Sequence, residues 1–349
     1  MKNLEKGVAA SWLAVICIVI GLAIGAGIGY WIATPAPEEV KALKIGVVMW
    51  WHHDEGIWSP SHAKAVEALE AKYDLEITWI EETGIVDVEG VIRTAAGMYD
   101  IIYVETDEFA EAVKTVAAEY PDIPFIQEWE ATKLAPDEFP SNVVALNAYD
   151  AYKVNFLLGA AAGKITEENK LGIILAIAGP RSYRIVSNAF REGARYANPD
   201  IEVTQVVMDA YSDPIKSRDT VASFVEAGID VVWVNQDDFA ATLEAAVHGI
   251  YTIQQYLDVT PYYPDTIIGC GIWDWEVELD KALNAIVEDQ FEEFRAANHQ
   301  LVLSFEDKSL DVPTWGNMVP ESVKEYIAEL REDIIAGTVV VPEITTWTP

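Results

Sequence analysis

The stretch that decides the fold is residues 44–80, KIGVVMWWHHDEGIWSPSHAKAVEALEAKYDLEITWI. It begins with an apolar, β-branched run at 44–49, continues with helical spacing of apolar residues over 61–73, and ends with a second strand-like run at 75–80. A strand, a helix and a strand of these lengths are typical of a βαβ unit, whose two strands lie parallel. The stretch therefore predicts a parallel sheet covered by helices.

The same alternation continues along the chain and then restarts. Strand-like runs and helical stretches alternate up to residue 147, and a second series begins with a helix over 150–164. The second series has strand-like runs at 171–177, 202–208 and 230–234. We therefore expect an α/β chain of two similar lobes, each a parallel sheet flanked by helices.

The lobe boundaries follow from this restart. We expect lobe 1 to span 43–148, lobe 2 to span 149–272, and 273–349 to cross back and complete lobe 1. A chain that passes several times between two lobes is typical of hinged domains that close on a ligand.

An apolar segment near the N-terminus predicts a membrane anchor. Residues 8–33 carry no charge and are long enough to cross roughly 30 Å of hydrocarbon as a helix. Lys2 and Lys6 precede the segment and two glutamates follow it, which places 1–7 in the cytoplasm, 34–42 as a spacer, and the rest outside the cell. The expected localisation is the cell membrane, with a single-pass anchor and an extracellular soluble domain. A cleaved signal peptide is the alternative, although its apolar region usually has only about 7–15 residues.

The charge balance excludes nucleic acid as a partner. The chain has 23 Lys and Arg against 57 Asp and Glu, a formal net charge of −34. Phosphate backbones would be repelled by such a surface. With 51% hydrophobic residues among 349, the chain can still bury one or two cores. Cys17 and Cys270 lie far apart in sequence, so we expect no disulfide, and we expect no cofactor.

Tryptophan recurs where predicted strands end. Trp50 and Trp51 follow the first strand, Trp129 follows the run that ends near 128, and Trp273 and Trp275 follow 266–272. The carboxyl ends of parallel strands line the ligand crevice of an α/β protein. Aromatic faces gathered there indicate a planar or sugar-like ligand held by stacking. Trp273 and Trp275 share one face of an extended segment, so that one could stack on the ligand while the other packs.

Two strand-to-helix junctions carry residues that commonly cap helices. Ser59 is followed by a proline, and Asp213 repeats that arrangement. We expect both side chains to cap the helices that follow them.

Short motifs recur in a fixed order along the chain. The first lobe carries WSPSH at 58–62, IEE at 80–82, VIRTAAGMYDII at 91–102 and VAAEYPDIPF at 116–125. The second carries LGAAAGKIT at 158–166, NKLG at 169–172, AFREGA at 189–194 and AGIDVV at 227–232. In this order and spacing they resemble the basic membrane protein family of ABC-transporter solute receptors, over about residues 44–275.

The resemblance implies a type I periplasmic-binding-protein fold without catalysis. It also implies a purine nucleoside or purine base as ligand, carried between two closing lobes to an ABC permease. The segment WWHHDE at 50–55 is unusual for that family, and the ends of the strands are more acidic.

Trp58 and three histidines belong to the first loop. The place of Trp58 in the matching motif favours stacking on the ligand over plugging its helix. His52, His53 and His62 could suggest a metal, but adjacent histidines usually point apart and no cysteine assists, so we expect none. We expect His53 to contact the ligand, and His62 to be a polar ligand contact or a helix-terminus residue.

Polar side chains at strand ends complete the predicted site. Carboxylates accept hydrogen bonds from ribose hydroxyls or purine N–H groups, asparagines also donate, and arginine can stack on a ring or form a surface ion pair. The candidates are Glu105, Glu128 and Asp237, then Asn147 and Asn235, and Arg184.

Two other function classes stay open. Tryptophan platforms with paired acids also occur in extracellular carbohydrate-binding proteins and glycoside hydrolases. A ligand-sensing or structural surface protein could use the same fold, because fold does not fix function.

Overall fold

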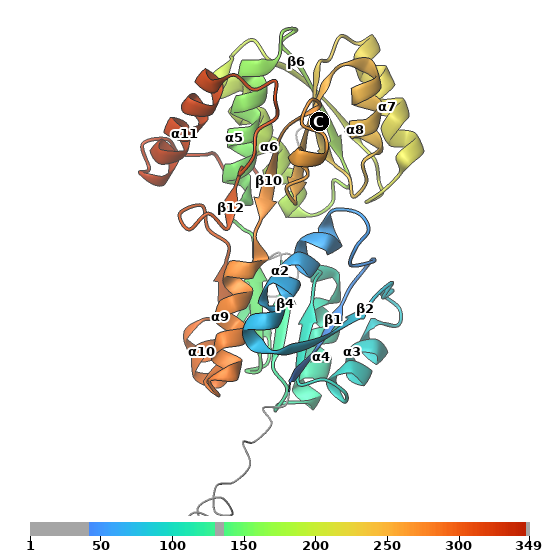
Figure 1. Ribbon diagram of the computed structural model, residues 1–349, viewed down its shortest axis with the longest axis vertical. Helices are drawn as coiled ribbons and strands as arrows, with labels where there is room; N and C mark the ends of the chain where they lie inside the picture. The colour runs from blue at the N-terminus through green and yellow to red at the C-terminus, as the bar shows by residue number, and fades with distance from the viewer. Residues whose placement is uncertain (1–41, 130–135, 347–349) are drawn as a thin grey trace, which may run out of the picture. The chain divides into compact units, whose positions relative to one another are not determined.

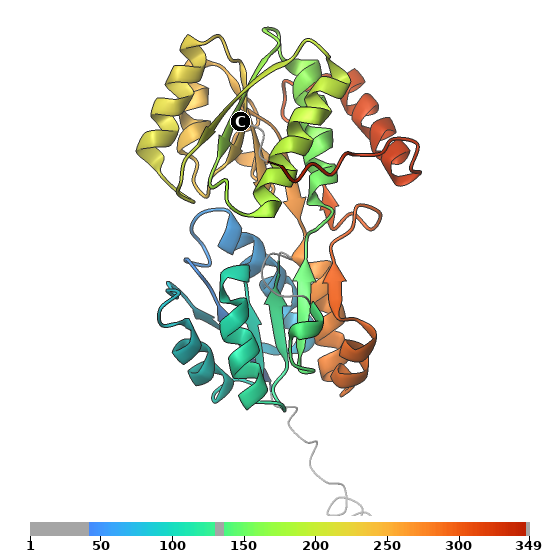
Figure 2. The ribbon, with the colours of Figure 1, turned by 180° about the vertical axis from the view of Figure 1, so that it is seen from behind.

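The computed structural model describes residues 42–129 and 136–346, in which the strands form two six-stranded sheets (Figures 1 and 2). The predicted anchor at 8–33 lies outside the described residues, as do 1–7 and most of the spacer. Within the described ranges, no helix combines the length and the apolar character needed to cross a membrane.

Lobe 1 is built on the first sheet, whose strands are all parallel. In spatial order they are β11 (Gln300–Val302), β5 (Val143–Asn147), β4 (Phe125–Glu128), β3 (Ile101–Val104), β1 (Leu43–Val48) and β2 (Leu75–Ile80). Its helices are α2 (Trp58–Tyr73), α3 (Val88–Ala96), α4 (Ala110–Glu119), α9 (Trp275–Val287) and α10 (Phe291–Ala297), with short 3₁₀ turns η1 (Asp107–Phe109) and η2 (Pro136–Glu138).

Both faces of this sheet are buried, which explains its continuous apolar strands. Ile101 and Tyr103 pack in a cluster with α2 and α9, whereas Ile102 and Val104 pack with α3 and α4. Successive side chains of a strand point to opposite faces. The run IIYV therefore serves two cores, as expected of a parallel sheet between helical layers.

Lobe 2 is built on the second sheet, which is parallel except for one edge strand. In spatial order its strands are β12 (Leu310–Asp311, antiparallel), β10 (Ile267–Trp273), β9 (Tyr251–Tyr256), β8 (Val231–Asn235), β6 (Lys170–Leu175) and β7 (Glu202–Val207). Its helices are α5 (Ala151–Ile165), α6 (Arg181–Ala197), α7 (Pro214–Glu226), α8 (Ala240–His248) and α11 (Glu321–Ile335), with the 3₁₀ turn η3 (Thr260–Tyr262).

The C-terminal part of the chain corrects one expectation. We expected 273–349 to complete lobe 1, and α9, α10 and β11 do so. The chain then returns to lobe 2, where β12 pairs with the free edge of β10 and α11 packs against α5. The apolar side chains of α11 recur on one face of the helix, and covering them requires a helical partner. Within the described residues the chain thus crosses between the sheets three times, after β5, β10 and β11.

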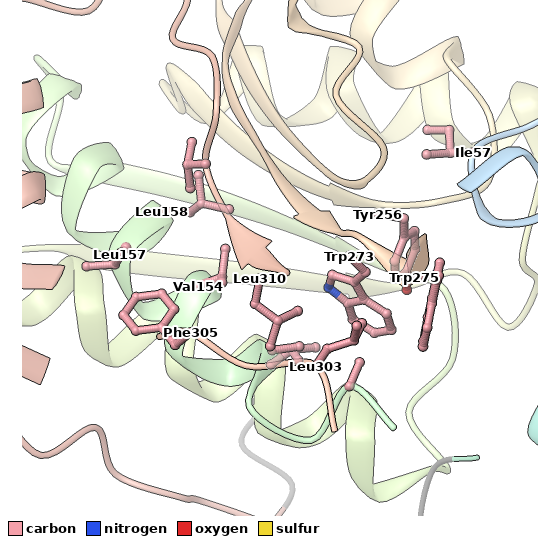
Figure 3. Close-up of a cluster of buried hydrophobic side chains, with 14 of the residues drawn as sticks. Ile57, Val154, Leu157, Leu158, Tyr256, Trp273, Trp275, Leu303, Phe305 and Leu310 are labelled. Atoms are coloured by element: carbon pink, nitrogen blue, oxygen red, sulfur yellow. The ribbon is translucent and has the colours of Figure 1, made fainter. Parts of the chain in front are cut away.

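A buried apolar cluster accompanies these crossings (Figure 3). Trp273 ends β10, Trp275 begins α9, and Leu303 and Leu310 stand at either end of the third crossing. Side chains of α5, such as Val154, belong to the same cluster. The core is therefore continuous where the chain passes from one sheet to the other.

The small-residue motifs of lobe 2 bring two helices into backbone contact. A Cβ added at Gly159 of α5 would lie 1.9 Å from the carbonyl oxygen of Phe190 in α6. A Cβ at Gly193 of α6 would lie 1.9 Å from the carbonyl oxygen of Phe156 in α5. Neither helix can approach so closely with a larger residue at these positions, so the two glycines set the distance between the helices.

Replacement of Gly159 by alanine tests this packing. We expect Gly159→Ala to lower the free energy of unfolding by at least about 1–3 kcal/mol, because a backbone carbonyl cannot move aside. Gly90→Ala in α3 is the matched control: nothing lies within 4 Å of a Cβ added at this position, and relief of glycine's entropy cost should stabilise the chain by about 0.5–1 kcal/mol. Urea denaturation measures both, and equal stabilities of the two variants would contradict the proposed contact.

Candidate ligand-binding site

A pocket lies at the carboxyl ends of strands from both sheets and is lined by both lobes. The cavity has a volume of about 130 Å³. Three aromatic residues from each lobe line it, together with polar side chains. Lobe 1 contributes Trp50, Trp51, Trp58, Ser59, Thr106, Asp107, Glu108 and Glu128, and lobe 2 contributes Ala176, Pro180, Tyr183, Tyr211, Asn235, Gln236, Asp237 and Tyr256.

Trp50 and Trp51 lie where β1 ends, as the sequence predicts, and both line the pocket. The indole of Trp50 stacks on Phe109, with ring centroids 5.5 Å apart, and meets the edge of Tyr211 from lobe 2 at 6.2 Å. Trp51 is 44% exposed, a large exposure for tryptophan. One ring is thus held in place from behind, and its neighbour is available to a ligand.

Trp58 also lines the pocket, at the start of α2. Its indole Nε1 donates to the carbonyl oxygen of Glu105 at 3.3 Å. Its ring meets Tyr256 and Trp273 of lobe 2 edge to face, at centroid distances of 4.9 and 5.5 Å. Edge-to-face contacts between aromatic rings are favourable. The ring of Trp58 therefore belongs both to the pocket wall and to the aromatic cluster beneath it.

Trp273 and Trp275 do not line the pocket, contrary to our expectation. Trp273 is 6% exposed and packs beneath Trp58. Trp275 is fully buried, and its Nε1 donates to Ser61 Oγ at 3.2 Å. Trp275 begins α9 and faces the core between that helix and α2, so it supports the wall without forming it (Figure 3).

His62 is likewise a buried support and not a lining residue. Its ring stacks on Trp275 at 4.4 Å and its Nδ1 is hydrogen-bonded to the hydroxyl of Tyr103. Burial lowers the pKa of His62 well below its usual value, so the imidazole is neutral. Of the two roles expected for His62, its position near the start of α2 fits the helix-terminus residue, and it is not among the residues that line the pocket.

Glu105 is fully buried behind the pocket. Its Oε1 accepts hydrogen bonds from the backbone N–H of Trp50 at 2.8 Å and from Ser59 Oγ at 2.7 Å. Burial raises the pKa of Glu105 to about 8, so the carboxyl is largely protonated at neutral pH. Glu105 therefore positions two lining segments and does not itself line the pocket, as we had expected it to do.

Asp237 connects the lobes. This lobe 2 carboxylate accepts hydrogen bonds at Oδ1 from the backbone N–H groups of Ile57 (2.5 Å) and Trp58 (2.8 Å), at the start of α2 in lobe 1. The residue at the N-cap position of α2 makes no side-chain capping bond, so Asp237 takes that role from the other lobe. Gly56 has φ of +84°, and a Cβ there would lie 2.8 Å from Asp237 Oδ2. Only glycine suits both the backbone and the space.

Two further features accompany this connection. Burial raises the pKa of Asp237 to about 6. The hydroxyl of Tyr211 in lobe 2 donates to Glu108 Oε1 in lobe 1 at 2.7 Å. The structure therefore represents a state in which the two lobes contact each other across the pocket.

Three polar residues at strand ends line the pocket in different ways. Glu128 ends β4 and is 1% exposed. Asn235 is engaged within lobe 2: Nδ2 donates to the Tyr256 hydroxyl at 2.8 Å and Oδ1 accepts from the N–H of Ala176 at 3.3 Å. Gln236 donates through Nε2 to Ala210, while its buried Oε1 accepts no hydrogen bond from the described residues. Glu128 and Gln236 thus offer acceptors, and Asn235 orients a tyrosine.

His53 and Trp129 are not among the residues that line the pocket. His53 stacks on Trp79, with ring centroids 5.0 Å apart, and its Nδ1 lies 2.6 Å from Glu81 Oε1. Hydrogen bonds from His53 lower the pKa of Glu81 to about 2. Trp129 is 5% exposed and packs in the core beneath α3 and α4. Their predicted contacts with the ligand are not found in the pocket.

Asn147 and Arg184 are placed elsewhere as well. Asn147 lines a smaller pocket beside Tyr149 and Trp273, next to the first crossing. Arg184 donates through Nε to the carbonyl oxygen of Thr345 at 2.8 Å and through Nη1 to that of Gly179 at 2.5 Å. The arginine fastens the C-terminal segment to α6 and does not stack on a pocket ring.

Sequence reasoning missed the three tyrosines of the pocket. Tyr256 is the last residue of β9, Tyr211 follows β7, and Tyr183 lies in the first turn of α6 after β6. The tryptophans were chosen because they follow the carboxyl ends of strands, and the same reasoning would have selected these tyrosines. Gln236 could have been found in the same way, since it directly follows Asn235 at the end of β8.

The geometry defines the class of protein. Two α/β sheets, joined by three crossings and enclosing a pocket at their strand ends, form a periplasmic-binding-protein-like fold. The solved structure of an ABC transporter solute-binding protein from Conexibacter woesei has a TM-score of 0.72 at 19% identity, covering 86% of this chain and 99% of that one. A solute-binding protein structure from Aeropyrum pernix has a TM-score of 0.70 at 19% identity, covering 86% and 94%.

The family follows from the sequence. The pattern of the Bmp family, described as "ABC transporter substrate-binding protein PnrA-like", matches residues 43–345. The chain belongs to this family, and it is a solute-binding protein and not an enzyme.

The names of two curated relatives state a ligand for each of those proteins. A purine-binding protein of Brucella abortus is 25% identical over 317 residues, covering 88% of this chain and 85% of the relative. A Haloferax volcanii protein that is provisionally named an ABC transporter glucose-binding protein is 27% identical over 282 residues, covering 80% and 68%.

The buried carboxyl behind the pocket gives a pH prediction. The pKa of Glu105 is about 8 in the folded chain against an ordinary 4.5, so between these values the folded state keeps a proton that the unfolded state has released. The free energy of unfolding therefore falls as pH rises through this window. We expect Glu105→Gln to keep both hydrogen bonds at Oε1. Between these two pH values its free energy of unfolding should fall less than that of the wild-type chain, by about a few kcal/mol.

Thermal or urea unfolding at about pH 5 and pH 8 measures this difference. Glu70→Gln, at an exposed position of α2, is the matched control and should follow the wild-type pH profile. If the free energy of unfolding falls by the same amount between about pH 5 and pH 8 in Glu105→Gln and in the wild-type chain, the carboxyl of Glu105 does not cause the pH dependence.

Proposed function

We propose that the chain is the extracellular receptor of an ABC importer, holding a purine nucleoside or purine base between its lobes and delivering it to a permease. The observation that carries this proposal is the pocket lined by three aromatic residues from each lobe. A planar base can stack on rings that approach it from both sides. The purine-binding relative supports the same ligand class.

The polar groups of the pocket suit a ligand rich in hydrogen-bond donors. Glu128, Asp237 and the Oε1 of Gln236 offer acceptors. Ribose hydroxyls and the N–H groups of a purine supply donors, and bonds to carboxylates are stronger than neutral ones. The nucleoside is thus held by stacking of its base and by acceptors at the strand ends.

The charge of the lining residues separates nucleosides from nucleotides. Among the described residues that line the pocket there are four carboxylates, namely Asp107, Glu108, Glu128 and Asp237, and no lysine or arginine. A phosphate group would enter without a cationic partner and would be repelled. The proposed ligand is therefore uncharged.

The proposed setting is the cell surface. Residues 8–33 would hold the receptor in the membrane as an uncleaved helix, with the binding domain outside the cell. A receptor beside its permease would release the ligand when the lobes open.

A sugar is the second candidate ligand. The Haloferax volcanii relative is provisionally named a glucose-binding protein. Sugars also stack their apolar faces on tryptophan. The two candidates differ in what they require from the pocket, because a monosaccharide has no planar base to fill the space between opposing rings.

Calorimetric titration of the purified full-length chain separates the candidates. We expect saturable binding of at least one of adenosine, guanosine, inosine and adenine, and at least hundredfold weaker binding of adenosine monophosphate than of adenosine. The absence of measurable binding with all four compounds would contradict the assignment of a purine ligand. Binding of glucose in that case would establish the sugar alternative.

Trp51 provides a test of stacking that spares the core. It is 44% exposed and lines the pocket. Stacking of a base on an aromatic side chain is worth about 1–3 kcal/mol, so Trp51→Ala should weaken nucleoside binding by roughly 5- to 150-fold without changing the melting temperature. Tyr262→Ala is the control, because Tyr262 is 76% exposed and is not a lining residue. Unchanged affinity in Trp51→Ala would exclude that ring from the contact.

Asp237 tests closure. Its bonds to Ile57 and Trp58 join the two lobes, and hydrogen bonds to charged groups contribute about 1.5–3 kcal/mol each. We expect Asp237→Ala to weaken ligand binding at least tenfold, and Asp237→Asn, which keeps an oxygen acceptor, to weaken it less. The same calorimetric titration measures both, and wild-type affinity in Asp237→Ala would show that this contact does not favour the closed state.

A further inference from the structure

The loop after β1 and the end of β2 bring together side chains that commonly bind metals. β1 and β2 are parallel neighbours with Val48 opposite Ile80, so the residues that follow both strands meet at one edge. One ligand atom each from His53, Asp54 and Glu81 lies within 4.8 Å of the others. Nδ1 of His52 lies 3.4 Å from the second oxygen of Glu81.

This cluster is held in shape by its surroundings. The ring of His53 lies nearly parallel to that of Trp79, with an interplanar angle of 7°. The backbone N–H of His53 donates to Glu81 Oε1 at 2.9 Å, and that oxygen also lies 2.6 Å from Nδ1 of the same histidine. Backbone and side chain of His53 are therefore both fixed relative to the carboxylate, which lowers the cost of organising a site.

We propose that His53, Asp54 and Glu81 bind one divalent transition-metal ion of the zinc type. Imidazole nitrogen and carboxylate oxygen are ligands that Zn²⁺ takes, and three such ligands with one water molecule would complete its usual tetrahedral shell. The sequence-based expectation of no metal considered only histidines and cysteines. The fold supplies the carboxylate of Glu81, which lies 28 positions from His53 in sequence.

The position of the cluster gives such an ion a consequence for the pocket. His52 directly follows Trp51, and their rings are in contact with centroids 5.2 Å apart. An ion bound by His53, Asp54 and Glu81 would anchor the loop that carries Trp50 and Trp51 to the end of β2. This proposal does not depend on which solute the pocket binds.

Zinc titration of the purified full-length chain tests the proposal. We expect binding of one Zn²⁺ per chain by calorimetry, and a visible absorption band when Co²⁺ is used instead. Glu81→Gln and Asp54→Asn should each weaken Zn²⁺ binding at least tenfold. Asp54 is exposed, so its variant should fold normally and keeps the test valid if Glu81→Gln proves unstable. His248→Ala is the matched control, since His248 pairs with Glu244 on α8, and it should bind Zn²⁺ like the wild-type chain.

Three outcomes would overturn the proposal. These are no saturable binding of Zn²⁺, equal binding in the wild-type chain and both cluster variants, and loss of binding in His248→Ala alone.

Discussion

The hydrogen bonds from Ile57 and Trp58 to Asp237 are the interaction on which the site depends. A helix begins with N–H groups that lack partners, and α2 leaves these to a carboxylate from the other lobe. The same contact requires glycine at position 56 and places the indole of Trp58 beside Tyr256. The start of α2, one wall of the pocket and the approach of the lobes are thus set by one side chain.

Behind this wall lies a layer of buried polar groups that do not line the pocket. Glu105 ties the loop of Trp50 to Ser59 on α2, and His62 bonds to Tyr103 while stacking on Trp275. Their hydrogen bonds join segments that are distant in sequence, and burial disfavours their charged forms. They hold aromatic residues in fixed orientations, which a stacking site requires if its rings are to meet a ligand without rearrangement.

The sequence was a good guide to the sheets and a weaker guide to the site. The continuous apolar run IIYV and the βαβ order of 44–80 predict parallel strands from local pattern alone. Trp50 and Trp51 were found because they follow a strand directly. Trp275 was misplaced because it already belongs to α9, whose packing turns it to the core.

Pairings between distant segments explain the other differences. Asp213 caps α7 as expected, whereas Ser59 donates to Glu105 and leaves the capping of α2 to Asp237, 178 positions further on. The return of β12 and α11 to lobe 2 likewise depends on the free edge of β10 and on the surface of α5. The local sequence pattern predicts neither contact, because the periodicity of apolar residues does not show which strand edge or helix surface is left uncovered by the rest of the chain.

The glycine contact between α5 and α6 has a mechanical consequence. α5 begins directly after the first crossing, and α6 begins at the pocket with Tyr183 in its first turn. Because Gly159 and Gly193 bring the two backbones into direct contact, the helices cannot slide past each other and must turn as one body. A rotation of α5 about the first crossing is therefore passed on to Tyr183 through α6. Two glycines that do not line the pocket thus couple the hinge to the pocket wall.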